Sequence, residues 1–197
     1  METLSALILF AVVTTITPGG ATTLSTASGM NFGVRRSLPL IGGMVSGLAT
    51  LVFCAGFGLA SLMSAFPVLE LGLRVAGSAY LLWLAWRTAR NGPPGSAGDV
   101  EARPWSWLAG LALVSVNPKA WAMAFGASAA FAGSMDDPVA AALVMALVFL
   151  VCGSAALTLW CGAGTLMARL LRTERQWHLL NGVLGLLLLA SIIPMWT

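Results

Sequence analysis

Six long apolar runs determine most of what this chain can fold into. They cover residues 4–31, 38–65, 69–89, 105–133, 138–168 and 177–196. Each run is long enough to cross a hydrocarbon core of roughly 30 Å as a helix. Backbone polar groups in lipid have to be satisfied within the segment, and the runs lack the alternating polar pattern of a transmembrane barrel. The runs therefore predict an all-α integral membrane protein with six transmembrane helices.

The composition of the chain is typical of a protein that lies in a lipid bilayer. Hydrophobic residues make up 58% of the sequence, charged residues 9%, and the mean hydropathy is +0.90. The net charge of +3 comes from basic residues in short loops, so a nucleic-acid partner is not indicated. Cys54, Cys152 and Cys161 stand singly in apolar runs without C-x-x-C spacing, which favours inert thiols. We expect no metal and no cofactor.

The arginines predict the orientation of the chain in the membrane. Cytoplasmic loops carry an excess of Lys and Arg. The loops after the first, third and fifth runs are therefore expected to face the cytoplasm, and both termini the outside. The basic residues of these loops are Arg35, Arg36, Arg87, Arg90, Arg103, Arg169, Arg172 and Arg175.

A polar stretch divides the chain into two halves. Residues 91–104, "NGPPGSAGDVEARP", are rich in Gly and Pro and read as a cytoplasmic linker. Residues 1–90 and 105–197 then hold three helices each, together forming one membrane domain. Because three is an odd number, the second half enters the membrane from the opposite side. The halves are therefore predicted to form an inverted repeat.

The first helix of each half contains a proline near mid-depth. The first run reads "TITPGGATTLS" and the fourth reads "SVNPKAWAMAF". In each, a residue suited to N-capping, Thr17 or Asn117, precedes a proline, Pro18 or Pro118, which is well tolerated at the first helical position. Each pair predicts the start of a new half-helix. The alternative is that the prolines merely kink continuous helices.

Half-helices that begin at mid-depth would create a binding site. Their free N–H groups and positive dipole ends favour an anion such as a carboxylate. Gly19 and Gly20 would let a ligand approach the backbone closely. We therefore predict a substrate-binding site formed by Thr17, Pro18, Gly19, Gly20, Asn117, Pro118 and Lys119.

Lys119 is the single lysine of the chain and falls beside the second break. A charge at mid-depth is costly unless it faces a hydrated or paired cavity. Its ammonium reaches only about 6 Å, too short to snorkel to an interface. We expect it to pair with a substrate carboxylate or to carry a proton during transport. A structural contact with backbone carbonyls is the alternative.

Four stretches resemble the LysE/RhtB family of bacterial amino-acid exporters over essentially the whole chain. They are "TPGG", "SGMNFGVRRSLPLIGG", "AGSAYLLWLAWR" and "NPKAWAMAF". The resemblance implies a six-helix inner-membrane exporter of a small amino acid or derivative, thought to be proton-driven and often homo-oligomeric. Family members usually read Pro-Gly-Pro where this chain has Pro18-Gly19-Gly20. Many carry an acid where this chain has Leu48, so a basic substrate is not expected.

Two other functions remain open from the sequence. A membrane thiol-disulfide relay on a related broken-helix fold would need paired cysteines beside the prolines, and the three cysteines lie elsewhere. A structural or channel-like membrane protein without coupled transport is the other. Our prediction is a secondary exporter working by alternating access, and not an enzyme.

Overall fold

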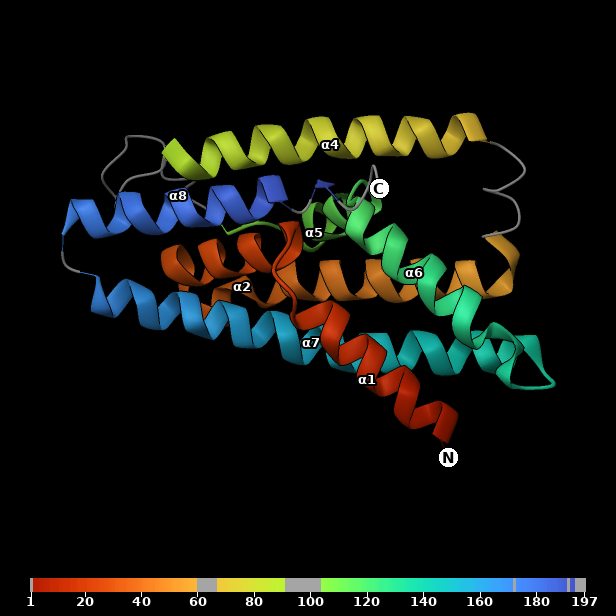
Figure 1. The fold of residues 1–197 in the computed structure, drawn as a ribbon. Helices are drawn as coiled ribbons and strands as arrows, with labels where there is room; N and C mark the ends of the chain where they lie inside the picture. Colours follow the sequence, from red (N-terminus) through yellow and green to blue (C-terminus); the bar gives the residue numbers. More distant parts are fainter. Residues whose placement is uncertain (1, 60–66, 91–103, 172, 191, 194–197) are drawn as a thin grey trace.

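Helices make up every regular element that the computed structural model describes, which confirms the predicted all-α class. It describes residues 2–59, 67–90, 104–171, 173–190 and 192–193, so nearly all of the predicted linker 91–104 lies outside them. The helices are α1 (Glu2–Ile16), α2 (Gly20–Cys54) with a π-helical end (Ala55–Leu59), α4 (Pro67–Arg90), α5 (Trp107–Ser115), α6 (Pro118–Phe131) with a short 3₁₀ turn (Ala132–Ser134), α7 (Pro138–Leu170) and α8 (Glu174–Ala190) (Figure 1).

Two of the described helices are long and apolar enough to cross a membrane. They are the helix over residues 20–58 and α7. The bent pair of α5 and α6, whose axes differ by 68°, would make a third span. α1 is an apolar helix of 15 residues, but at 1.5 Å per residue it extends only about 22 Å. The count of six spans stays a prediction.

The chain reverses direction inside α2 at Gly33. This residue has φ 74° and ψ 168°, a backbone conformation that glycine adopts readily. The hydroxyls of Ser28 and Ser37 lie 2.7 Å apart, although nine residues of continuous helix would separate them by about 13 Å along the axis. Figure 1 shows the two halves of α2 running in opposite directions. We call residues 20–32 the first arm of α2 and residues 34–54 the second arm.

Both arms of α2 pack against α7. The first arm runs parallel to it, since Ser25 Oγ donates to the Leu157 carbonyl at 2.7 Å and Thr165 Oγ1 donates to the Gly29 carbonyl at 3.1 Å. The contact is very close. A Cβ atom placed on Gly164 would lie 2.1 Å from the carbonyl oxygen of Thr26. Small residues at this crossing allow the two backbones to touch, as they do at many membrane helix interfaces.

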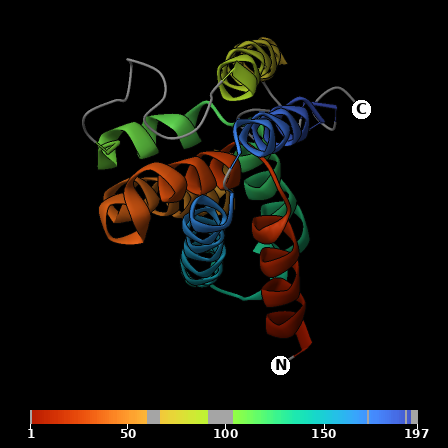
Figure 2. The ribbon, with the colours of Figure 1, turned by 90° about the vertical axis from the view of Figure 1, so that its left-hand side faces the viewer.

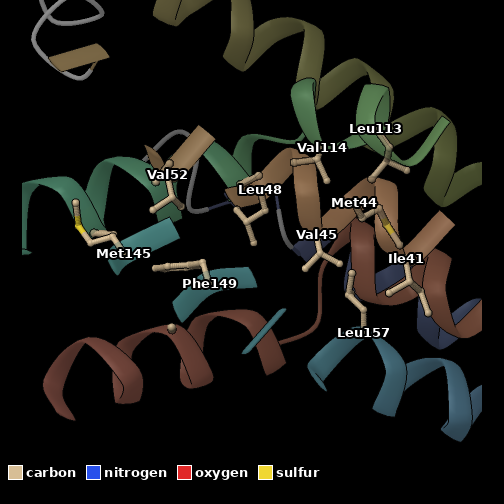
Figure 3. Packing of buried hydrophobic residues seen from close by; sticks show 14 of the residues in the cluster. Ile41, Met44, Val45, Leu48, Val52, Leu113, Val114, Met145, Phe149 and Leu157 are labelled. Carbon is tan, nitrogen blue, oxygen red and sulfur yellow. The ribbon is translucent and has the colours of Figure 1, made fainter. Parts of the chain in front are cut away.

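The core lies where the second arm of α2 meets α5 and α7 (Figure 3). A Cβ on Gly43 would lie 1.9 Å from the Trp107 carbonyl oxygen, so α5 and the second arm also approach backbone to backbone. The spaces around these crossings are filled by interlocking apolar side chains. Figure 3 labels Ile41, Met44, Val45, Leu48, Val52, Leu113, Val114, Met145, Phe149 and Leu157.

The remaining helices lie on opposite sides of this core. Figures 1 and 2 place α4 and α8 side by side along one edge and α1 on the other. The contact of α1 is with α7 and α6. The turn at Gly33, the end of α4 and the connection from α7 to α8 lie at one end of the bundle (Figure 1). These are the segments next to the arginine-bearing loops.

Candidate functional site

The first helix break spans Thr17, Pro18 and Gly19. α1 ends at Ile16 and α2 begins at Gly20. The prediction that Thr17 is the N-cap of α2 is wrong. The hydroxyl of Thr17 instead donates to the Val13 carbonyl at 2.6 Å, at the end of α1. Gly19 caps α2 instead, with its N–H donating to Thr22 Oγ1 at 2.7 Å. A threonine hydroxyl can donate to the carbonyl four residues earlier, and Thr17 makes this local bond instead of capping α2.

The second break follows the prediction. Asn117 is the N-cap of α6 and accepts the Lys119 backbone N–H on Oδ1 at 3.1 Å. Pro118 is the first residue of the helix, where its missing N–H costs nothing. α5 and α6 meet at 68°, so the break is a sharp bend rather than a shallow kink.

The side chain of Lys119 joins the two breaks. Its ammonium donates to the Thr17 carbonyl and lies 3.5 Å from the Pro18 carbonyl oxygen. Thr17 and Pro18 lie between the last residue of α1 and the first residue of α2, so their carbonyls lie outside the hydrogen bonds within either helix and a cation can satisfy them. The backbone-carbonyl alternative is therefore the contact that the structure shows. The expected pairing with a substrate stays a prediction.

Beside this contact lies a small cavity between α1, α2, α5, α6 and α7. Its volume is about 40 Å³, enough for about three water molecules at about 10–15 Å³ each by the same measure. An amino acid needs more room, so in this arrangement the cavity is too small to hold one. The lining residues are Thr15, Gly19, Ala21, Thr22, Met44, Val45, Leu48, Val114, Asn117, Lys119, Ala120, Met123, Gly153 and Leu157.

The predicted site residues divide into three groups around this cavity. Gly19, Asn117 and Lys119 line it. Thr17 and Pro18 reach it only through their carbonyl contacts with Lys119. Gly20 and Pro118 are buried at the starts of their helices and are not among the lining residues.

Several lining residues were missed from the sequence. Thr15 and Thr22 flank the first break, one turn to either side, and their hydroxyls add polar surface. Leu48, already noted as a departure from the family pattern, lies on the second arm of α2 and faces the cavity. Gly153 and Leu157 come from α7, and no motif in the sequence marks them. Their position depends on packing between distant segments.

The polar residues that line the cavity belong to the two breaks or stand within three residues of them: Thr15, Thr22, Asn117 and Lys119. We call them the polar end of the cavity, and the methionine, valine and leucine side chains that line it the apolar end. None of the lining residues is acidic. A molecule with one carboxylate and an uncharged side chain matches this division, because the only charge offered to it is positive.

Gly19 gives room to the Lys119 side chain. A Cβ at position 19 would lie 2.9 Å from Lys119 Cδ and 3.4 Å from its Nζ. Because the lysine stem is flexible, Gly19→Ala should displace the ammonium from the Thr17 carbonyl rather than unfold the protein. An off-rotamer side chain costs about 0.5–1.5 kcal/mol, so we expect transport to weaken about 3- to 10-fold, measured as initial efflux rate. Gly182→Ala, where nothing lies within 4 Å of the new Cβ, is the matched control. Equal rates in both variants would contradict this packing role.

The described residues offer no grouping typical of metal or thiol chemistry. In the described segments, no three of His, Cys, Asp and Glu come together as a metal site. Cys54, Cys152 and Cys161 are free thiols, and none of them lines the cavity. A thiol-disulfide relay centred on the two prolines therefore has no cysteine at the site.

Comparisons with known proteins identify the family of this chain. Residues 12–191 match the LysE type translocator family. The cysteine/O-acetylserine efflux protein of Escherichia coli (strain K12) is 33% identical over 187 residues, which cover 94% of this chain and 93% of the relative. A protein of the same description from Klebsiella pneumoniae subsp. pneumoniae is 33% identical over 170 residues, 85% of this chain and 84% of the relative. No solved structure matches significantly. The chain belongs to the LysE type translocator family, and it is a membrane transporter rather than an enzyme.

Proposed function

We propose that this protein exports a small neutral amino acid or a close derivative from the cytoplasm, by alternating access and driven by the proton gradient. The observation that carries the proposal is the position of Lys119. Its ammonium lies where the two helix breaks meet, and its side chain lines the small cavity beside them. Relatives described as cysteine/O-acetylserine efflux proteins favour a substrate of this size.

A substrate carboxylate would take the polar end of the cavity. The N-terminal ends of the first arm of α2 and of α6 lie beside it, with Gly19 and Asn117 as their caps. Helix N-termini favour an anion through their free N–H groups and dipole. Lys119 adds a full positive charge in a low-dielectric surrounding. The carboxylate would then replace the Thr17 carbonyl as the partner of the ammonium.

The substrate side chain would take the apolar end. Leu48, Met44 and Met123 line it without a polar group. A positively charged side chain would find no acid there to neutralise it, and burying an unpaired charge is costly. The lining therefore favours a short, uncharged side chain. This includes the substrates named in the descriptions of the relatives.

Helix packing is consistent with the proposed inverted repeat of three plus three helices. α1 packs against α7, and α5 packs in the same way against the second arm of α2. α4 and α8, the last helices of the two halves, pack against each other. Rocking of such halves about a central site would expose the cavity to each side in turn. The arginine-bearing end of the bundle would face the cytoplasm of a bacterial inner membrane, with both termini outside.

Counterflow in liposomes tests this proposal. Liposomes that contain the purified protein are loaded with unlabelled O-acetylserine. They should transiently accumulate labelled O-acetylserine from the outside. Cysteine should compete with labelled O-acetylserine for uptake. Lysine should not, because its side chain adds a positive charge, and cysteamine should not, because it lacks the carboxylate. An imposed pH gradient should drive net movement.

Two results would count against it. Competition by cysteamine as strong as that by cysteine would show that the carboxylate is not recognised. Flux without exchange, independent of the substrate inside, would instead indicate a channel. Liposomes without protein and liposomes containing Lys119→Met protein provide the background.

A further inference from the structure

The carbonyls at the inner end of α1 have dedicated side-chain donors, and one of them comes from α7. Trp160 Nε1–H donates to the Ile16 carbonyl at 3.0 Å, across 144 residues of sequence. Ile16 is itself exposed on the surface of the described structure. A free carbonyl at membrane depth costs several kcal/mol, so this indole removes a substantial penalty at the break.

The second break has a corresponding bond with a different origin. Trp121 Nε1–H donates to the Ser115 carbonyl at 2.8 Å, only six residues away. That bond closes α5 onto the start of α6 within one broken helix. The bond of Trp160 instead ties α1 to another helix. Each indole satisfies the carbonyl of the last residue of a half-helix, Ile16 of α1 or Ser115 of α5, but of the two bonds only that of Trp160 fixes a half-helix to another helix of the core.

α1 packs on the core along one narrow row of residues. Its buried residues are Leu7, Ala11 and Thr15, a single row with a spacing of four. Most of its large apolar side chains are exposed on the outer face: Leu4, Ile8, Leu9, Val12, Val13 and Ile16. The ring of Phe10 also meets those of Phe131 and Phe149, with centroids 6.0 and 6.2 Å apart, but Phe10 lies six residues before the end of α1. The inner end of α1 therefore depends on two side-chain donors, Lys119 from α6 and Trp160 from α7.

These two donors differ in what transport requires of them. Lys119 faces the cavity and would change partner when a carboxylate enters. Trp160 is uncharged and is not among the residues that line the cavity. Its bond can persist while Lys119 exchanges the Thr17 carbonyl for the substrate.

We propose that Trp160 is a positioning residue for transport: its indole N–H holds the inner end of α1 on α7, so that Lys119 can release Thr17 without Thr15 leaving the cavity wall. The effect of Trp160 on transport rests on the proposed function. The anchoring of α1 on α7 by Trp160 does not depend on a substrate. Without the indole bond, release by Lys119 would let the end of α1 separate from the core.

The anchoring is testable by the reactivity of one cysteine. Cys54, Cys152 and Cys161 are replaced by alanine, and Thr15→Cys places a thiol on the buried, cavity-lining face of α1. We expect Trp160→Phe, which keeps an aromatic ring but removes the donor, to raise the rate of maleimide labelling about five- to tenfold, as expected for the loss of one hydrogen bond. Trp121→Phe removes the same donor from the local bond and should leave the labelling rate unchanged. Trp160→Tyr, which retains a donor on a ring, should restore part of the protection.

Transport provides the second measurement. In counterflow, Trp160→Phe should raise the half-saturation concentration about fivefold, because Lys119 and Thr15 are no longer held in place before binding. Monodisperse elution and a single cooperative melting transition would establish that the variant folds. Equal cysteine reactivity with Trp160 and Trp160→Phe would overturn the anchoring, even in protein that exchanges amino acids. Absence of exchange by protein carrying every native residue would overturn the proposed function instead.

Discussion

Replacing Lys119 with methionine should abolish transport while leaving the fold intact. Methionine keeps most of the apolar stem that packs over Gly19 and removes the ammonium. Among the described residues that line the cavity, Lys119 is the only charged one, so an entering carboxylate would then meet no positive side chain from them. Leaving a buried charge without its partner costs about 3–5 kcal/mol. We therefore expect initial counterflow rates to fall at least about 100-fold.

Stability should change much less than transport. The substitution leaves the Thr17 carbonyl without its donor, which costs about 1–3 kcal/mol. It also removes the cost of holding an ammonium at membrane depth, which is of similar size on insertion scales. The two effects oppose each other. A melting temperature close to that of the unsubstituted protein would show that the loss of transport is a binding defect.

Two further variants separate charge from shape. Arg169→Met removes an exposed positive charge at the end of α7 and should transport normally. Lys119→Arg keeps the charge but needs more room beside Gly19, so partial activity is expected. Full transport by Lys119→Met would show that the ammonium has only the structural role seen in its contact with Thr17, and the proposed carboxylate site would have to be abandoned.

The largest effect on stability is expected from Gly164→Ala. The new Cβ would lie 2.1 Å from the carbonyl oxygen of Thr26, and backbone cannot yield as a flexible side chain can. α7 and the first arm of α2 would have to separate, which would weaken the hydrogen bonds between Ser25 and Leu157 and between Thr165 and Gly29. Overpacking of this kind typically costs 1–3 kcal/mol or more.

α7 contains its own control two residues away. A Cβ on Gly162 meets nothing within 4 Å, so Gly162→Ala changes the same residue type on the same helix without a clash. We expect Gly164→Ala to lower the melting temperature in detergent by at least about 5 °C, at roughly 2–4 °C per kcal/mol for a chain of this size. Gly162→Ala should shift it by less than about 2 °C. Equal shifts would mean that the close crossing does not limit stability.

The two breaks show what local chemistry can and cannot predict. Asn117 and Pro118 cap and begin α6 as the sequence predicted, because a short polar side chain followed by proline satisfies the start of a helix within a few residues. The same pattern at Thr17 and Pro18 led to the wrong cap. Thr17 lies at the end of a preceding helix, where its hydroxyl can bond backward, and Gly19 is left to cap α2.

The apolar runs and the prolines therefore determined the class of protein, the places where helices break and the need to shelter Lys119. These follow from the lipid surroundings and from hydrogen bonds between residues that are close in sequence. Tertiary structure decided which groups meet: Lys119 with Thr17, Trp160 with Ile16, and Leu48, Gly153 and Leu157 around one cavity. These groups are brought together by close backbone crossings such as Gly164 against Thr26. This crossing joins segments more than a hundred residues apart, and its geometry depends on the packing of the whole bundle rather than on any short stretch of sequence.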